Sequence, residues 1–234
     1  MIVKVDTDKR KIAESISALW GTTLDSGIDF LSANIEVYSF NANEPIYKEN
    51  ETPEYLMYLL QGKVKIYKDG ICGRNQITRM INQKGFFGFR AAFAEEDYLN
   101  SASACEPSVI CMIPLKAVKR MMAEDCSISM FFLKQLAILL GVSDTRTVNL
   151  TQKHIRARIA ESLVTLKEQY GVEEDGSTLK IHLSREDLAC LSNMTTSNAI
   201  RTLSAFAQDN IIATDGRKIK LLDEEKLRYI SELG

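Results

Sequence analysis

Residues 183–212, LSREDLACLSNMTTSNAIRTLSAFAQDNII, contain two helical patterns separated by a short polar interruption. Ser184 and Thr195 stand where helix N-caps are expected, because each hydroxyl residue precedes an apolar periodic run. Asn193 lies between the two runs and tolerates the left-handed backbone that a sharp turn requires. The segment therefore predicts two helices joined by a short turn, and no other part of the chain is constrained so narrowly.

The second predicted helix has one apolar face and one slim polar face. The apolar positions recur at helical spacing and are expected to be buried: Ala199, Ile200, Leu203, Phe206 and Ala207. The opposite face holds small polar residues and one cation: Thr196, Ser197, Arg201, Ser204 and Gln208. A guanidinium among short side chains suits a helix that approaches base edges, because Arg pairs with guanine O6 and N7 as a bidentate donor.

The next segment, NIIATDGRKIKLL, predicts a β-hairpin with Asp215-Gly216 at its tip. A helix–turn–helix followed by a hairpin is a winged helix-turn-helix, whose second helix enters the major groove of DNA. The expected DNA contacts are Thr195, Thr196, Ser197, Asn198 and Arg201 in the second helix and Arg217 and Lys218 in the wing. A merely solvated polar face on a three-helix scaffold is the alternative interpretation.

The charge balance of this region is close to neutral. From residue 151 onward there are 12 Lys or Arg and 13 Asp or Glu, so any electrostatic attraction to DNA must be local. Two basic patches are candidates, one at Lys153, Arg156 and Arg158 and one at Arg217, Lys218 and Lys220. The acids are expected to gather elsewhere, in 173–175 and 223–225, and nonspecific DNA affinity is expected to be modest.

The N-terminal half has a sequence pattern typical of short β-strands. Between residues 35 and 113, runs such as IEVYSF, YLMYLL, KVKIYK, QITRMI and SVICMI alternate with turn signals, which favours a sandwich or closed roll. Short helices are expected at 10–19 and 27–32. The predicted fold class is α+β: an N-terminal double-stranded β-roll of cupin-like jelly-roll type, a long dimerisation helix and a C-terminal winged helix-turn-helix.

The predicted domain ranges are 1–126 for the roll with its flanking helices, 127–150 for the long helix and 151–234 for the winged helix. Ser127 is the expected N-cap of the long helix. The first half of that helix is apolar nearly all round, so it needs cover on every side. A symmetric dimer supplies that cover through Phe131, Phe132, Leu136, Leu139 and Val142. A fully buried internal helix is the alternative.

Several classes of protein are disfavoured. No apolar run reaches the roughly 18 residues of a membrane span, and the N-terminus lacks the apolar core of a signal peptide, so the expected location is the cytoplasm, without membrane contact. The five cysteines are widely spaced and are expected to be buried free thiols. No iron–sulfur motif is evident, and one axial haem ligand is a low-weight alternative, so the cofactor stays unknown. Motifs of hydrolases, P-loop proteins and zincins are absent from the sequence, so an enzyme is not expected.

The order of strands, glycine turns, interface helix and winged helix resembles the Crp/Fnr family of bacterial regulators over nearly the whole chain. The strongest local matches are YLMYLLQGKVKIYK and residues 183–212. The resemblance implies a homodimeric transcriptional regulator that binds promoter DNA, contacts RNA polymerase and senses a small-molecule effector. A ligand-binding regulatory subunit whose winged helix contacts protein is the alternative function.

The resemblance also suggests roles for individual residues. Arg201 matches a DNA-reading arginine of the family, and Arg185 matches a phosphate contact. The Arg-Glu pair that commonly begins the family's recognition helix is replaced by Thr196-Ser197, so the operator is expected to differ from the usual one.

The sensor positions depart further from the family pattern. Phe89 follows Gly88 where cyclic-nucleotide binders carry Glu, and Asn100-Ser101 replaces the Arg-Ser that holds the cyclic phosphate. A buried phosphate needs a paired cation, so cyclic AMP is not the expected effector, although Arg90 is one alternative anion ligand. The effector-pocket candidates are Gly88, Phe89, Arg90, Asn100 and Ser101. The phenylalanine-rich stretch around them is either core or the lining of an apolar pocket.

Overall fold

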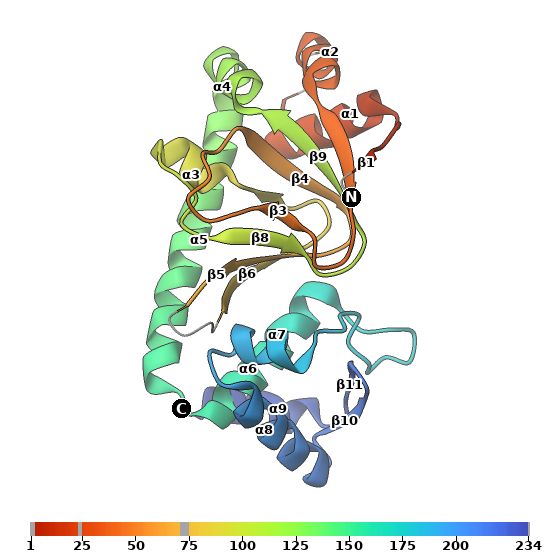
Figure 1. Ribbon diagram of the computed structural model, residues 1–234, viewed down its shortest axis with the longest axis vertical. Helices are drawn as coiled ribbons and strands as arrows, with labels where there is room; N and C mark the ends of the chain where they lie inside the picture. Colours follow the sequence, from red (N-terminus) through yellow and green to blue (C-terminus); the bar gives the residue numbers. More distant parts are fainter. Residues whose placement is uncertain (1–2, 23–24, 71–74, 234) are drawn as a thin grey trace. The chain divides into compact units, whose positions relative to one another are not determined.

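The computed structural model describes residues 3–22, 25–70 and 75–233. The chain forms two compact units (Figure 1). The first contains Met1–Lys68 and Met80–Val142, and the second contains Asp69–Arg79 and Ser143–Gly234. The boundary at Val142 falls within one long helix, whose residues therefore belong to both units.

The first unit is built on two antiparallel sheets, except that Gln76–Arg79 of the edge strand β6 belong to the second unit. The five-stranded sheet has the order β1-β2-β9-β4-β7 and the four-stranded sheet the order β3-β8-β5-β6. Their strands are β1 (Val3–Lys4), β2 (Glu36–Phe40), β3 (Pro45–Tyr47), β4 (Tyr55–Gln61), β5 (Val64–Lys68), β6 (Gln76–Ile81), β7 (Phe86–Phe87), β8 (Ser101–Ala104) and β9 (Ser108–Pro114). This arrangement confirms the predicted N-terminal β-roll, and the five strands expected from sequence are all present.

An apolar core fills the space between the two sheets. It includes Met57 and Phe87 from one sheet, Val64 and Ile66 from the other, and Tyr98 from the loop before β8. Gly62 makes the turn from β4 to β5 with φ +92°, and a Cβ there would lie 2.2 Å from the Ser108 hydroxyl. The glycine in the QGK turn is therefore required by both backbone conformation and space.

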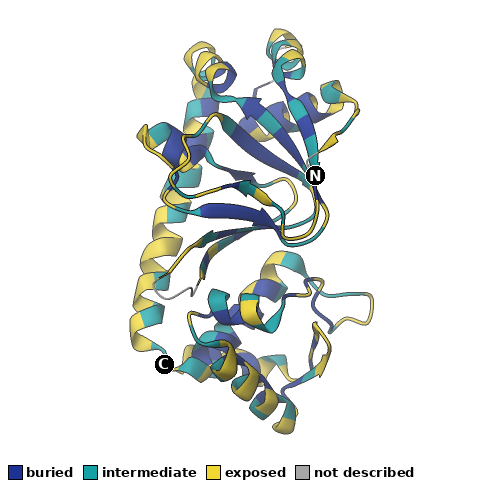
Figure 2. Ribbon diagram, in the orientation of Figure 1, coloured by how far each residue is buried: buried dark blue, intermediate teal, exposed yellow. Residues whose placement is uncertain are grey.

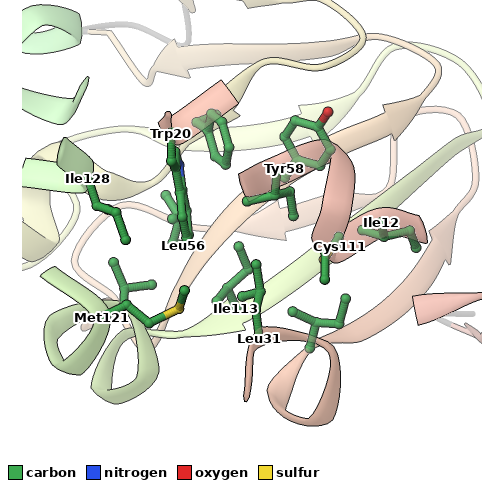
Figure 3. Packing of buried hydrophobic residues seen from close by; sticks show 14 of the residues in the cluster. Ile12, Trp20, Leu31, Leu56, Tyr58, Cys111, Ile113, Met121 and Ile128 are labelled. Carbon is green, nitrogen blue, oxygen red and sulfur yellow. The ribbon is translucent and has the colours of Figure 1, made fainter. Parts of the chain in front are cut away.

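Helices cover the outer face of the five-stranded sheet. They are α1 (Lys9–Trp20), α2 (Asp25–Asn34) and α4 (Leu115–Glu124), together with the first turns of the long helix α5 (Cys126–Gln152). Their apolar side chains pack with those of β2, β4 and β9 in a second core, part of which Figure 3 shows. Trp20 lies at its centre, with its ring centroid 5.8 Å from Phe86 and 5.9 Å from Phe132.

Helix α5 begins earlier than predicted. Ser127 is not its N-cap: the helix starts at Cys126, and the Asp125 carboxylate accepts the Ser127 amide at 2.9 Å. Asp caps helices as well as Ser does. Phe132, expected at the dimer surface, is only 1% exposed because it completes the core around Trp20. Phe131, Leu136 and Leu139 are partly buried against the same core.

Much of α5 is nevertheless exposed (Figure 2), and many of its exposed side chains are apolar. The large exposed side chains are Met130, Leu133, Ile138, Leu140, Val142 and Val148, with exposed fractions between 49% and 65%. By length and composition this 27-residue helix could cross a membrane, so the sequence argument that the run is too short is wrong. Only 11% of its most apolar 18-residue window is buried within the chain.

The second unit contains α6 (Ile155–Tyr170), α7 (Arg185–Leu191), α8 (Thr196–Gln208), the hairpin β10 (Ile212–Asp215) with β11 (Lys218–Leu221), and α9 (Glu224–Glu232). A glycine after an amphipathic run predicts a helix stop at Gly171, and Gly171 ends α6 with φ +73°. The sequence LKIHLS, residues 179–184, predicts a short strand. That prediction is wrong, because this segment contributes only a bridge of Leu179 to Val172. The chain then runs without regular structure to the cap of α7.

The cysteines are more varied than predicted. Cys111 is buried, and burial raises the pKa of its thiol to about 12. Cys105 and Cys190 are half-buried, and Cys126 is exposed because it begins α5. The prediction of buried thiols is therefore wrong for Cys126, and Cys72 lies outside the described residues.

Candidate nucleic-acid interface

Helices α7 and α8 are joined by a sharp turn. The Ser184 hydroxyl accepts the Asp187 amide at 2.9 Å and donates to the Asp187 carboxylate at 2.8 Å, which begins α7. Asn193 has φ +50°, and the Thr195 hydroxyl then accepts the Asn198 amide at 3.3 Å. The caps and the left-handed residue all lie where the sequence predicts them, so the helix–turn–helix is locally encoded.

Helix α8 is buried along a narrow stripe. Ala199, Leu203 and Phe206 are at most 2% exposed. Ile200, predicted to be buried, is 48% exposed, and Ala207 is half-buried. The other face is open to solvent, with the exposed side chains Thr196, Ser197, Arg201, Ser204 and Gln208.

The cation on this face is held by a neighbour on the same helix. The Arg201 Nη2 donates to the Asn198 side-chain oxygen at 2.6 Å, a contact between residues three positions apart on one face. This hydrogen bond restricts the rotamers of Arg201 before any ligand arrives. Asn198 is half-buried at the start of α8. Its side-chain oxygen therefore helps to fix the orientation of the Arg201 guanidinium.

The hairpin forms with a two-residue turn, Gly216-Arg217, between the paired residues Asp215 and Lys218. The predicted tip is therefore displaced by one residue, with Asp215 ending β10. Residues 214–218 are all exposed. The side chain of Arg185, the first residue of α7, reaches the tip and donates from Nη2 to the Gly216 oxygen at 2.8 Å.

Acidic side chains neutralise most of the predicted basic patches. Lys153 pairs with Glu161 and Arg156 with Asp209. The expectation that residues 173–175 gather away from the wing is wrong: Glu173 lies 3.8 Å from the Lys218 ammonium, and Asp175 lies 3.4 Å from that of Lys220. The loop after α6 is anchored there because Asp175 accepts the Thr178 amide at 2.8 Å.

Arg158, Arg201 and Arg217 form no ion pair with a described acid. Arg201 and Arg217 are exposed, whereas Arg158 is half-buried. Exposed guanidinium groups without an acidic partner therefore lie on the open face of α8 and at the tip of the wing.

A half-buried arginine that the sequence analysis did not single out lies in the same unit. Arg146 of α5 donates to the backbone oxygens of Thr78 at 2.6 Å and Leu191 at 3.0 Å, and also to that of Ile77. Burial lowers the pKa of its guanidinium. Since Leu191 ends α7, Arg146 supports the residue from which the turn begins. No sequence signal marked Arg146, because its neighbours in residues 143–149, SDTRTVN, are mostly polar as well.

The effector-pocket candidates do not form a cationic site. Phe89 is 2% exposed and belongs to the core, and Arg90 of α3 (Phe89–Ala94) is an exposed ion-pair partner of Glu96. Asn100 accepts the Tyr47 hydroxyl at 3.3 Å, and the Ser101 hydroxyl accepts the Glu49 amide at 3.0 Å.

Aromatic side chains occupy the space beside Gly88. Tyr47 and Tyr98 stack with ring centroids 3.8 Å apart, and burial raises the pKa of Tyr98. A Cβ at Gly88, where φ is +83°, would lie 2.2 Å from the Met57 methyl and 3.4 Å from the Tyr98 hydroxyl. These contacts favour a packed apolar interior at this position.

A β-roll in one unit and a winged helix-turn-helix in the other define a DNA-binding transcriptional regulator. Residues 37–125 match the cyclic nucleotide-binding domain family, and residues 157–230 match the Crp-like helix-turn-helix domain family. The chain belongs to the Crp/Fnr family of transcriptional regulators. The transcriptional regulators that this chain matches are not enzymes.

Known relatives cover most of the chain. The CRP-like cAMP-activated global transcriptional regulator of Mycobacterium tuberculosis is 24% identical over 203 residues, which are 86% of this chain and 91% of the relative. The cAMP-activated regulator CRP of Pasteurella multocida is 23% identical, over 84% of this chain and 95% of its own length.

Solved structures share the fold. FixK2 from Bradyrhizobium japonicum superposes with a TM-score of 0.76 at 21% identity, over 84% of this chain and 96% of that one. A CooA mutant from Carboxydothermus hydrogenoformans has a TM-score of 0.73 at 19% identity, over 98% of both chains. At these identities the likeness concerns the fold alone.

Proposed function

We propose that this regulator is a cytoplasmic homodimer that reads promoter DNA of a specific sequence with α8, and that its effector is not cyclic AMP. The observation that carries the proposal is the open face of α8, where Arg201 is exposed, unpaired by any described acid and oriented by Asn198. The basic and acidic residues from residue 151 onward nearly balance. DNA recognition therefore depends on specific contacts rather than on a broad basic surface.

In this proposal Arg201 donates to guanine O6 and N7 in the major groove, which is the commonest specific base contact. Thr196 and Ser197 are short enough for the helix backbone to approach the bases. Thr195 and the free amides of the first turn face phosphate oxygens, where a helix N-terminus favours anions. Arg217 at the wing tip contacts a neighbouring phosphate, with Lys218 beside it.

The second copy of the chain covers the apolar face of α5. The revised interface consists of the exposed residues Met130, Leu133, Ile138, Leu140 and Val142, and the partly buried Phe131, Leu136 and Leu139 at its edge. A two-fold dimer presents two α8 helices, so the operator is an inverted repeat with half-sites about 34 Å apart. Contact with RNA polymerase is proposed from family membership.

The proposal on the effector follows from the interior of the roll. A cyclic nucleotide carries a phosphate anion, and no Lys or Arg among the described residues is buried between the sheets. Burying that anion without a cation costs several kcal/mol. An effector of another kind would act by shifting the packing of α5 and thereby the spacing of the two α8 helices, a population shift between dimer arrangements.

The test compares Arg201→Ala with Arg228→Ala, which removes the same charge from α9. Arg201→Ala should cost about 1–3 kcal/mol of binding free energy at one base position and relax specificity there. Arg228→Ala should leave the base preference unchanged. Equal preferences in wild type and Arg201→Ala would reject Arg201 as a reader.

A salt titration separates this function from the alternative in which the winged helix contacts protein. DNA affinity that falls steeply as salt rises indicates phosphate contacts, because binding releases counterions from the duplex. An affinity for DNA that salt does not change would favour a protein partner.

A further inference from the structure

The side chain of Arg185 leaves its own helix and reaches the wing. Its Nη2 donates to the backbone oxygen of Gly216 at 2.8 Å, across 31 positions of sequence. Its Nη1 is buried and has no hydrogen-bond partner within the described part of the chain. The guanidinium is thus half covered at the wing tip instead of being extended into solvent.

The local helix does not explain a cation at this position. The N-terminal end of a helix favours acidic side chains because of its dipole. The first turn of α7 supplies two of them, Glu186 and Asp187. Arg185 opposes this preference, so its contact with the wing is the better account of the residue.

Besides Arg185, the wing tip is held by a long ion pair, in which the Glu173 carboxylate lies 3.8 Å from the Lys218 ammonium. Residues 214–218 are exposed, and a two-stranded hairpin alone is marginally stable. The base of β11 is supported by the Leu179 amide, which donates to the Ile219 oxygen at 2.9 Å. That contact lies beyond the turn, whereas the Arg185 hydrogen bond acts on the turn itself.

We propose that Arg185 is a positioning residue for the wing, holding the Gly216-Arg217 turn so that Arg217 meets a DNA phosphate. This inference rests on the proposed DNA-binding function and changes the role that family resemblance implies for Arg185, from phosphate contact to support of the turn. A turn that is ordered before binding loses less conformational entropy when it docks.

A double-mutant cycle tests the inference, with a fluorescein-labelled random-sequence DNA duplex at low ionic strength as the probe. Arg185→Ala and Arg217→Ala should each weaken binding by about tenfold, the value of a lost charge-assisted hydrogen bond. The double variant should be no weaker than either single variant, because both changes remove one contact. An additive loss of about a hundredfold would show that Arg185 contacts phosphate independently and would overturn the proposal.

Conservative variants separate geometry from charge. Arg185→Gln keeps an N–H donor without the charge and should recover part of the lost affinity. Arg185→Lys keeps the charge. Full recovery by Lys together with no recovery by Gln would contradict a positioning role.

Amide hydrogen exchange in the free full-length chain gives a readout that needs no DNA. Arg185→Ala should accelerate exchange at Arg217 and Lys218, whereas Arg217→Ala should leave exchange at Lys218 unchanged. Unchanged exchange in Arg185→Ala would overturn the positioning role. If Arg185→Ala accelerates exchange but the wild-type chain binds no duplex, the proposed DNA-binding function is rejected. The contact between Arg185 and Gly216 would still support the wing.

Discussion

Replacing Leu140 should dissociate the proposed dimer without unfolding the chain. Leu140 is 65% exposed on α5. Full burial of a leucine stabilises by about 1.5–3 kcal/mol, so covering the exposed part adds about 1–2 kcal/mol in each copy. A two-fold interface contains the side chain twice, and Leu140→Ala should therefore raise the dimer dissociation constant about 30- to 700-fold.

Leu140→Asp should act more strongly, because the carboxylate would also lose hydration in the interface. Sedimentation equilibrium over a range of protein concentrations measures both variants. Leu99→Asp is the matched control, since Leu99 is 52% exposed in the loop before β8 and is not part of α5. A wild-type chain that sediments as a monomer, or a Leu140→Asp variant that associates as tightly as wild type, would refute the interface. Wild-type protein recovered with membranes would assign the apolar face to lipid instead.

Three further predictions concern the single chain. Ile200→Ser should lower the free energy of unfolding by about 1 kcal/mol, because about half of the side chain is already exposed, whereas Leu203→Ala should cost about 2–5 kcal/mol, as chemical denaturation can measure; equal costs would contradict the observed faces of α8. Hydrogen bonds from Thr178 and Ser177 hold the pKa of Asp175 below its usual range, so the stabilisation is present above about pH 4 and is lost as the pH falls further. The difference in Tm between wild type and Asp175→Asn should accordingly shrink in acid, and a constant difference would argue against it. Iodoacetamide should label Cys126 in the native chain and Cys111 only after unfolding; labelling of both at equal rates would contradict their burial.

Local signals predicted the helix–turn–helix well. Caps at Ser184 and Thr195 and the left-handed Asn193 depend on neighbouring residues only, so the sequence contains all that is needed. The same is true of Gly171 and of the turn at Gly62. Several residue types can cap a helix, so the sequence predicts that α5 exists but not where it begins. Asp125 takes the capping role that was expected of Ser127.

Errors arose where distant segments decide burial. Periodicity placed Ile200 in the core, but the stripe that α8 buries is narrower than its apolar pattern. Phe132 was assigned to a partner, although the outer face of the five-stranded sheet needed it as cover. Glu173 approaches Lys218 because the loop after α6 folds back on β11, and composition alone does not report such a contact. Short strands such as β7 lack any periodic signal.

The most direct test of DNA reading by two copies of α8 is selection of bound fragments from random DNA by the purified wild-type chain, followed by sequencing. An inverted repeat with half-site centres about one helical turn apart is predicted. The guanine at one position of each half-site should lose its enrichment when Arg201→Ala replaces wild type. Enrichment of single, unpaired sites, or of the same sequence by both proteins, would contradict the account.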